Sequence, residues 1–385
     1  MTASIKSLRK PSWRSVAAIV VLVAVLGNVI ACNRRDRAVD QFVEDAESVE
    51  GTDGSLTFQD VTLEQVDEKG QLVWKVRAQQ ARYSQDQKVA KIKNPTGELY
   101  QDGKKVFEIK ATEGEVQQDG KKIFLTGQIT ATDTQDGTIL KGRELEWRPQ
   151  DDVLIVRNSL TATHPQITAT ANEARAYSRA RRMEFLGGVT ANAKNPVLRM
   201  KADRVEWLIA PRLLKTDRPV QLERVIKEDQ IDRASGDQAT VNLGTQIVQV
   251  TKNANFALAS PPLTVRSNVM TWNVRQQTVA SDQPVVVKHS TEQITLRASQ
   301  GQLNLATQVV TLVGNVQGSS DRLGGQLTAE LLTWTLPTKF VEAEGNVVYV
   351  QTNPPLKVSG PRASGKLDEQ IAVVSGGRVT TELVP

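Results

Sequence analysis

Residues 309–316 read Val-Val-Thr-Leu-Val-Gly-Asn-Val and are followed by a second strand-like segment that ends in Leu-Thr-Trp at residues 332–334. Val310, Leu312 and Val316 occupy alternate positions on either side of Gly314. This two-residue period is typical of a β-strand that buries one face and exposes the other. A glycine in the middle of such a strand predicts a β-bulge or the close approach of another backbone.

The same alternation recurs around three further glycines, Gly127, Gly187 and Gly345. The apolar positions around them are, in order, Ile123, Leu125, Ile129 and Ala131; Met183, Phe185, Val189 and Ala191; and Val341, Ala343, Val347 and Tyr349.

Four tryptophans recur along the chain at a nearly constant spacing. Trp147, Trp207, Trp272 and Trp334 are 60, 65 and 62 residues apart, and each stands in a strand-like segment. Apolar residues stand two and seven positions before each Trp, so a one-residue bulge between them is expected to bring both onto one face. A fixed period of this length predicts a tandem repeat.

The repeat predicts an all-β, elongated fold of about twenty short strands. A unit of about 60 residues with four or so strands cannot bury its own apolar face, so neighbouring units must stack. Residues 56–108 are interpreted as a divergent first unit and residues 361–385 as a truncated last one. Two facing sheets of about ten strands each predict a body roughly 50 Å long.

The N-terminal segment predicts a membrane tether. Residues 1–31 hold four basic residues and no acidic one, and an apolar run extends over residues 16–31. The run ends in Val29-Ile30-Ala31-Cys32, which is similar to a lipoprotein cleavage site and predicts lipidation of Cys32. The alternative is an uncleaved anchor, with the basic residues keeping the N-terminus inside. Both interpretations place the body outside the cytoplasm. Residues 32–54 are expected to form a linker, in which residues 36–50 are either a short helix or a solvated spacer.

Composition argues against nucleic-acid binding and against catalysis. The net charge of +5 falls to +1 once residues 1–31 are set aside, because 44 basic residues then face 43 acidic ones. One Cys and two His give no material for a disulfide framework or a histidine-rich metal site, and no nucleophile-base constellation is seen. We therefore expect neither an enzyme nor a cofactor or metal. His164 and His289 both follow a repeat Trp by seventeen residues, where Arg224 and Gln351 stand in the other units, and are expected to be exposed.

The units resemble the periplasmic β-jellyroll family of lipopolysaccharide export, LptC with LptA/OstA-like repeats. The segments that carry the resemblance are 298–305, 309–316 and 327–334, and residues 67–74 resemble the start of LptC. The resemblance implies an open β-jellyroll with an LptC-like part over residues 55–165. It implies a continuous LptA/OstA-like part over residues 166–385.

The resemblance also implies a function. The implied function is that of a periplasmic carrier tethered to the inner membrane. This carrier would take lipopolysaccharide from an ATP-binding-cassette transporter and pass it along an apolar trough. Edge strands would pair with an LptA-like or an outer-membrane LptD-like β-jellyroll partner. The residues expected to line the trough are Ile123, Leu125, Ile129, Leu145, Trp147, Phe185, Val189, Trp207, Trp272, Val310, Leu312, Val316 and Trp334.

Alternatives remain open for several of these features. The tryptophans are read as core residues more readily than as lipid contacts. The basic cluster Arg179, Arg181 and Arg182 fits a solvated turn better than a phosphate site. The competing function is a non-catalytic β-solenoid scaffold lipoprotein that binds only other envelope proteins. An enzyme that processes polysaccharides would need carboxylates at equivalent positions of the repeat, and the sequence has none there.

Overall fold

The structure is a computed structural model, and it describes residues 48–50, 56–86, 88–117, 122–227, 230–322, 324–352, 355–367, 369, 371–377 and 379–382. Every regular element in these ranges is a β-strand, which confirms the all-β prediction. No helix in these ranges is long and apolar enough to cross a membrane. Cys32 lies outside the described residues, as does most of the predicted linker helix. Ser48–Glu50, the end of that segment, forms strand β1 on β2, so the helix prediction is wrong for these three residues.

The strands fall into a long and a short class. Long strands of ten or more residues are β2 (Leu56–Val66), β3 (Leu72–Tyr83), β8 (Ile123–Asp133), β9 (Ile139–Arg148), β10 (Val153–Thr163), β11 (Ile167–Tyr177), β12 (Arg182–Lys194), β13 (Val197–Leu208), β18 (Ile247–Leu258), β19 (Leu263–Asn273), β24 (Val309–Ser320), β25 (Gly325–Thr335), β26 (Phe340–Thr352) and β27 (Pro355–Lys366). Short strands are β4 (Val89–Lys93), β5 (Thr96–Gln101), β6 (Lys104–Lys110), β7 (Glu113–Gln117), β14 (Leu213–Thr216), β15 (Val220–Lys227), β16 (Gln230–Gly236), β17 (Gln238–Asn242), β20 (Thr278–Ser281), β21 (Val285–His289), β22 (Ile294–Ala298), β23 (Gln300–Asn304), β28 (Ile371–Ser375) and β29 (Thr380–Glu382).

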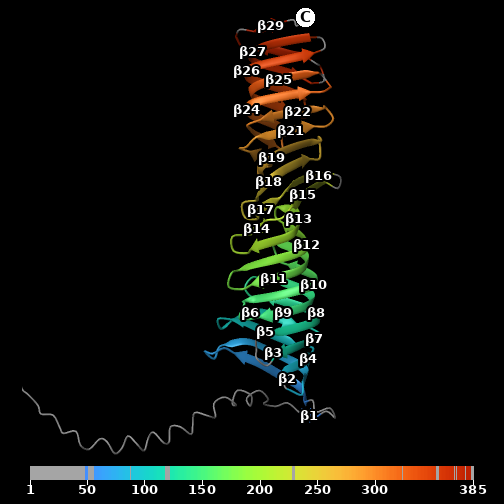
Figure 1. Ribbon diagram of the computed structural model, residues 1–385, viewed down its shortest axis with the longest axis vertical. Helices are drawn as coiled ribbons and strands as arrows, with labels where there is room; N and C mark the ends of the chain where they lie inside the picture. The colour runs from blue at the N-terminus through green and yellow to red at the C-terminus, as the bar shows by residue number, and fades with distance from the viewer. Residues whose placement is uncertain are drawn as a thin grey trace, which may run out of the picture.

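Each long strand belongs to two facing half-sheets. In β19, residues 263–266 pair with β21, whereas residues 271–273 pair with β20. Half-sheet A contains β5, β6, β15, β16, β21, β22 and β29, together with the ends of the long strands aligned with them. Half-sheet B contains β4, β7, β14, β17, β20, β23 and β28, with the opposite ends of the long strands. The result is the antiparallel jellyroll column in Figure 1.

A line of β-bulges forms the spine where strands pass from one half-sheet to the other. The pairing register shifts between Leu186 and Val189 in β12, and between Val313 and Val316 in β24. Gly187 and Gly314, which lie within these shifts, have φ angles of 75° and 78°. These bulges confirm the prediction made from the mid-strand glycines, because a positive φ is easily reached only without a Cβ atom.

The column is longer than the sequence analysis predicted. The ladder of half-sheet B runs from β3 to β28 through nineteen strand-to-strand steps. At ~4.8 Å per step, the column is about 90 Å long. The estimate of 50 Å was too short because each long strand adds one rung to both half-sheets. The ladder also continues from β10 to β11 across residue 165, and a division of the chain at residues 165/166 stays a prediction.

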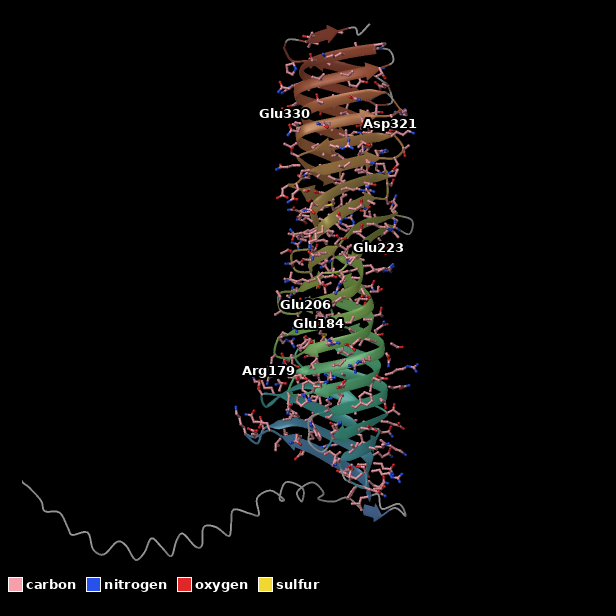
Figure 2. All side chains as sticks on the ribbon, in the orientation of Figure 1. Arg179, Glu184, Glu206, Glu223, Asp321 and Glu330 are labelled. Carbon is pink, nitrogen blue, oxygen red and sulfur yellow. The ribbon has the colours of Figure 1, made fainter. Side chains whose placement is uncertain are left out.

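Opposite the spine, two rows of turns line the mouth of the jellyroll. The row on half-sheet A comprises the turn of β5 and β6 at residues 102–103, and residues 134–138, 164–166, 195–196, 259–262, 290–293 and 321–322. The row on half-sheet B comprises residues 149–152, 178–181, 209–212, 243–246, 274–277, 305–308 and 336–339. Strand twist makes the mouth wind around the column. In Figure 2, Arg179 lies on the left of the lower part and Asp321 on the right of the upper part, although both belong to mouth turns.

Candidate lipid-binding interior

The interior between the half-sheets is one continuous apolar core. Buried aliphatic and aromatic side chains are in contact from Val61 near one end of the column to Val347 near the other. All thirteen predicted lining residues belong to this core, and none has more than 2% of its surface exposed. These thirteen side chains therefore point inward and fill the interior, while their contact with lipid stays a prediction.

The four repeat tryptophans lie at the mouth side of half-sheet B. Each is the second-last residue of its long strand, as Trp147 is in β9 and Trp272 is in β19. Along half-sheet B, four strand steps separate one Trp from the next, which is about 19 Å. The column therefore carries one Trp at the same depth in every repeat.

Each Trp contacts an aromatic ring from half-sheet A across the interior. Ring centroids are 6.5 Å apart for Phe107 and Trp147 and 5.2 Å apart for Phe256 and Trp272. In the two other layers a histidine takes the place of phenylalanine. We call these four ring pairs the aromatic clasps, and on their mouth side the core is completed by apolar residues of the turns, such as Leu243, Leu305 and Leu336. The pairs are Phe107–Trp147, His164–Trp207, Phe256–Trp272 and His289–Trp334.

The expectation that both histidines are exposed was wrong. His289 is 7% exposed and its ring lies 5.3 Å from that of Trp334, while half-buried His164 lies 4.8 Å from Trp207. Burial lowers the pKa of both imidazoles. The Nδ1 atom of His289 accepts a hydrogen bond from the backbone N–H of Glu292 at 3.2 Å. The two rings therefore act as neutral packing partners of the tryptophans.

A charged contact joins the two rows of mouth turns in the first half of the column. Arg181, from half-sheet B, donates to Asp133 at 3.1 Å and to Asp136 at 2.7 Å, both on half-sheet A. The Asp133 side chain is only 5% exposed, and burial raises the pKa of its carboxyl. Arg179 similarly reaches Asp102 at 3.0 Å, but both of these side chains are largely exposed.

A second charged contact spans the mouth farther along. Glu292 accepts from Lys339 of the opposite row at 2.8 Å and from Arg322 of its own half-sheet at 2.7 Å. The hydrogen bond from Lys339 is the largest of the effects that lower the pKa of the Glu292 carboxyl. Arg322 also donates to the backbone oxygen of Leu367, at 3.3 Å.

Two neutral hydrogen bonds complete the series. Gln246 Nε2 donates to Asn195 Oδ1 at 2.8 Å, and Gln308 Nε2 donates to the backbone oxygen of Ser260 at 2.9 Å. We call all these contacts between the two rows the mouth latches. They hold the half-sheets together at the side opposite the spine.

One ion pair lies inside the column. Arg224 and Asp232, on β15 and β16, are joined at 2.5 Å, and Asp232 is completely buried. The Arg224 guanidinium lies 5.4 Å from the Trp272 ring centre. Asp232 also accepts from the backbone N–H of Ala259 at 3.3 Å. A charged pair therefore flanks the clasp of Trp272.

The basic cluster at residues 179–182 lies at a turn, and its three arginines are all paired. Arg179 and Arg181 belong to the latches, while Arg182 contacts Glu184 and Glu206 and lies 4.0 Å from the Tyr177 ring centre. In the described ranges, no three His, Cys, Asp or Glu side chains gather in a way that could hold a metal ion.

The latches were not predicted from the amino-acid sequence. Asp133 continues the alternate inward positions Ile129 and Ala131 of β8, so its inward placement could have been noticed. Its partners could not, because Arg181 lies 48 residues away in a different half-sheet.

A family model supports the assignment suggested by this architecture. The model described as Lipopolysaccharide-assembly, LptC-related, matches residues 18–195 and 199–321, which is most of the chain. The chain belongs to the LptC-related family. A search of curated proteins finds no match. The matched residues of this LptC-related chain include the tryptophan repeats at Trp147, Trp207 and Trp272.

Membership assigns the chain a general role. The LptC family takes part in lipopolysaccharide transport as a non-catalytic component of the export bridge. Proteins of the family are periplasmic and anchored to the inner membrane.

Proposed function

We propose that this LptC-related chain is a carrier and bridge that receives lipopolysaccharide from an inner-membrane ATP-binding-cassette transporter. It then passes the acyl chains along its interior toward the outer membrane. The observation that carries this proposal is the unbroken apolar core between the half-sheets, from Val61 to Val347. Each methylene removed from water contributes ~0.8 kcal/mol, so a lipid with several acyl chains needs such a continuous lining.

The cross-section of the column fits an amphipathic ligand. The interior is apolar from the spine through the aromatic clasps to leucines of the mouth turns, and the charged latches join the two rows of turns at the surface of the mouth. Acyl chains would occupy the apolar part, while a sugar head would stay in water outside the mouth. Because side chains fill the interior, we infer that acyl chains enter by parting the two rows of turns and displacing the latches.

A photo-crosslinking experiment tests the carrier function. A photoreactive residue placed at Leu125, Phe185 or Leu312, which all face the interior, should form an adduct with lipopolysaccharide in cells. The matched controls are Thr126 and Thr311, which alternate with these residues and face away from the interior. If all three inward probes fail to capture lipid, the carrier function is wrong.

The alternative function is a scaffold lipoprotein that binds only other envelope proteins. The filled interior favours it, since the thirteen lining residues already bury one another. Absence of lipid adducts together with capture of protein partners would support this alternative.

The ends of the column offer edges for partner subunits. Among the described residues, β28 and β29 each pair with β27 alone, so each has an unpaired edge. We propose that an LptA-like or LptD-like β-jellyroll adds a strand there and that the end near β2 docks on the transporter. A crosslinker at Val373, which is 55% exposed, should capture such a partner, and a probe at Glu115 in β7, a strand paired on both edges by β4 and β8, should not.

The tether is proposed to be either the uncleaved segment 16–31 or a lipid on Cys32. The family match begins at residue 18 and so takes in most of the apolar run, which fits an anchor retained in the mature chain. The intact mass of the purified protein separates the two cases. A lipoprotein would begin at Cys32 and carry acyl groups, and replacing Cys32 with Ser would then abolish its processing.

A further inference from the structure

The four clasp tryptophans share a buried polar atom without a partner. Within the described residues, six buried side-chain nitrogen or oxygen atoms make no hydrogen bond. Four of these six are the indole Nε1 atoms of the repeat tryptophans, Trp147, Trp207, Trp272 and Trp334. The same unsatisfied N–H donor therefore recurs at the same depth in four successive layers.

Packing alone does not account for these donors. A buried N–H group without an acceptor loses its hydrogen bond to water and gains nothing in return. Phenylalanine would fill a similar space without that cost, and the chain does use Phe107 and Phe256 on the opposite side of two clasps. The repeated choice of Trp on half-sheet B indicates that the N–H groups receive an acceptor from outside the chain.

The surroundings favour an acceptor that is part of an apolar molecule. A buried water needs two to four polar partners. Next to Trp147 and Trp272 stand the rings of Phe107 and Phe256, and the carboxylate of Asp232 near the Trp272 clasp already accepts from Arg224 and Ala259. The histidines next to Trp207 and Trp334 each have an Nδ1 atom that already accepts a backbone hydrogen bond. An oxygen covalently attached to a hydrocarbon chain would enter this environment at less cost than a free water.

The depth of the clasps identifies the kind of oxygen. They lie in the outer part of the apolar interior, next to the mouth turns that carry the charged latches, and this is the side on which the acyl chains of a bound glycolipid would meet its sugar head. In an acylated sugar, this junction consists of ester and amide groups. Resting on the carrier function proposed above, we propose that the four indoles form a row of hydrogen-bond donors for the ester and amide carbonyl oxygens of the lipid. One such site recurs about every 19 Å along the column.

The first test follows the indole N–H groups directly. In full-length protein labelled with ¹⁵N at the indoles, lipopolysaccharide should move the N–H proton resonances of the four clasp tryptophans downfield. The resonance of Trp74, which lies in half-sheet A, should stay in place. Resonances that sit at the hydrogen-bonded position before lipid is added, and do not move, would show that water holds these donors and would overturn the proposal.

The second test removes one donor at a time and keeps an aromatic ring. Each of Trp147→Phe, Trp207→Phe, Trp272→Phe and Trp334→Phe should weaken binding of lipopolysaccharide about 2- to 10-fold, as expected for one neutral hydrogen bond. The control Tyr100→Phe, which removes an aromatic hydrogen-bond donor outside the apolar core, should leave the affinity unchanged. Measured in a Cys32→Ser background, in which the chain itself carries no lipid ester, the ester C=O stretching band of bound lipopolysaccharide should lie at lower frequency with the four tryptophans intact than in the Trp→Phe variants.

The outcomes separate this inference from the carrier function. If inward probes capture lipopolysaccharide but the indole resonances and the ester band do not respond, the donor row is wrong and the carrier function stands. If no probe captures lipid and no resonance moves, both are wrong.

Discussion

At the scale of single residues, the spine depends on backbone conformations that side chains tolerate poorly. Gly187 has a φ of 75°, and a Cβ atom added there would stand 2.6 Å from Nδ2 of Asn172. The adjacent Gly188 has a φ of 57° with open space around it. The corresponding positions after Gly314 and Gly345 are Asn315 and Asn346, which both have a φ of 49°.

These neighbours give a matched prediction. Gly187→Ala combines strain with a steric clash and should destabilise the column by about 2–3 kcal/mol. Gly188→Ala should cost about 1 kcal/mol, and Gly188→Asn should be close to neutral, because Asn adopts this conformation readily. Denaturant unfolding of the three variants checks the order. Equal losses at Gly187 and Gly188 would show that the close approach to Asn172 has no energetic weight.

The clasp histidines predict a dependence of stability on pH. Burial lowers the pKa of His289 below its ordinary value near 6.5, so the unfolded chain takes up a proton more readily than the folded chain. The stabilisation is complete above about pH 6.5 and is lost as the pH falls toward the folded-state pKa. The charged groups that act on His289 are Glu292 and Lys339, and those that act on His164 are Asp133, Asp136, Arg181 and Lys194.

Replacing the histidine isolates this effect. His289→Gln, which introduces the residue found at the equivalent position 351, should reduce the fall in unfolding midpoint between pH 7 and pH 5. Lys288→Gln, at the exposed neighbouring position, should leave the pH profile unchanged. An unaltered profile in His289→Gln would exclude this imidazole as the titrating group.

At the scale of elements, the mouth turns are held by contacts of unequal strength. The Asp133–Arg181 contact involves a carboxylate that is 5% exposed, whereas Asp102 and Arg179 are 70% and 52% exposed. Removing one member of a buried pair leaves an uncompensated charge, but an exposed pair contributes little. The two latches therefore differ in energy although they lie close together in the sequence.

This difference can be measured. Arg181→Gln should destabilise the protein by about 2 kcal/mol at pH 7, whereas Arg179→Gln should cost less than about 1 kcal/mol. Burial already raises the pKa of Asp133, and loss of Arg181 should raise it further. Since protonation removes the unpaired charge, the deficit of Arg181→Gln should shrink as the pH falls below that raised pKa. Unfolding midpoints at pH 7 and pH 4.5 test this, and a deficit independent of pH would contradict it.

At the scale of the whole molecule, the mouth is a seam that winds along a column of about 90 Å. Its latches are single side-chain contacts, whereas the spine is made of continuous strands. The half-sheets should therefore separate at the mouth and hinge at the spine.

Covalent closure of the mouth tests that motion. In the double variant Asn195→Cys/Gln246→Cys, a bismaleimide reagent should join the two turns and suppress lipopolysaccharide adducts at a probe on Phe185. The variants Asn195→Cys and Gln246→Cys, each treated alone with the same reagent, should retain the adducts. Because both still contain Cys32, they also control for reaction of the reagent at that residue. Undiminished adduct formation in the closed double variant would show that lipid does not enter through the mouth.

The all-β class, the repeat, the bulges at the spine and the inward positions can be predicted from the amino-acid sequence alone. These features follow from local rules, since alternation and mid-strand glycines act within one strand. The length of the column, the latches and the clasps depend instead on how distant segments pack in three dimensions. Trp334 meets His289, and Asp133 meets Arg181, because strand pairing stacks segments that are about 45 residues apart in the chain. The burial of His164 and His289 was missed for the same reason, since the facing half-sheet supplies the ring that covers each imidazole.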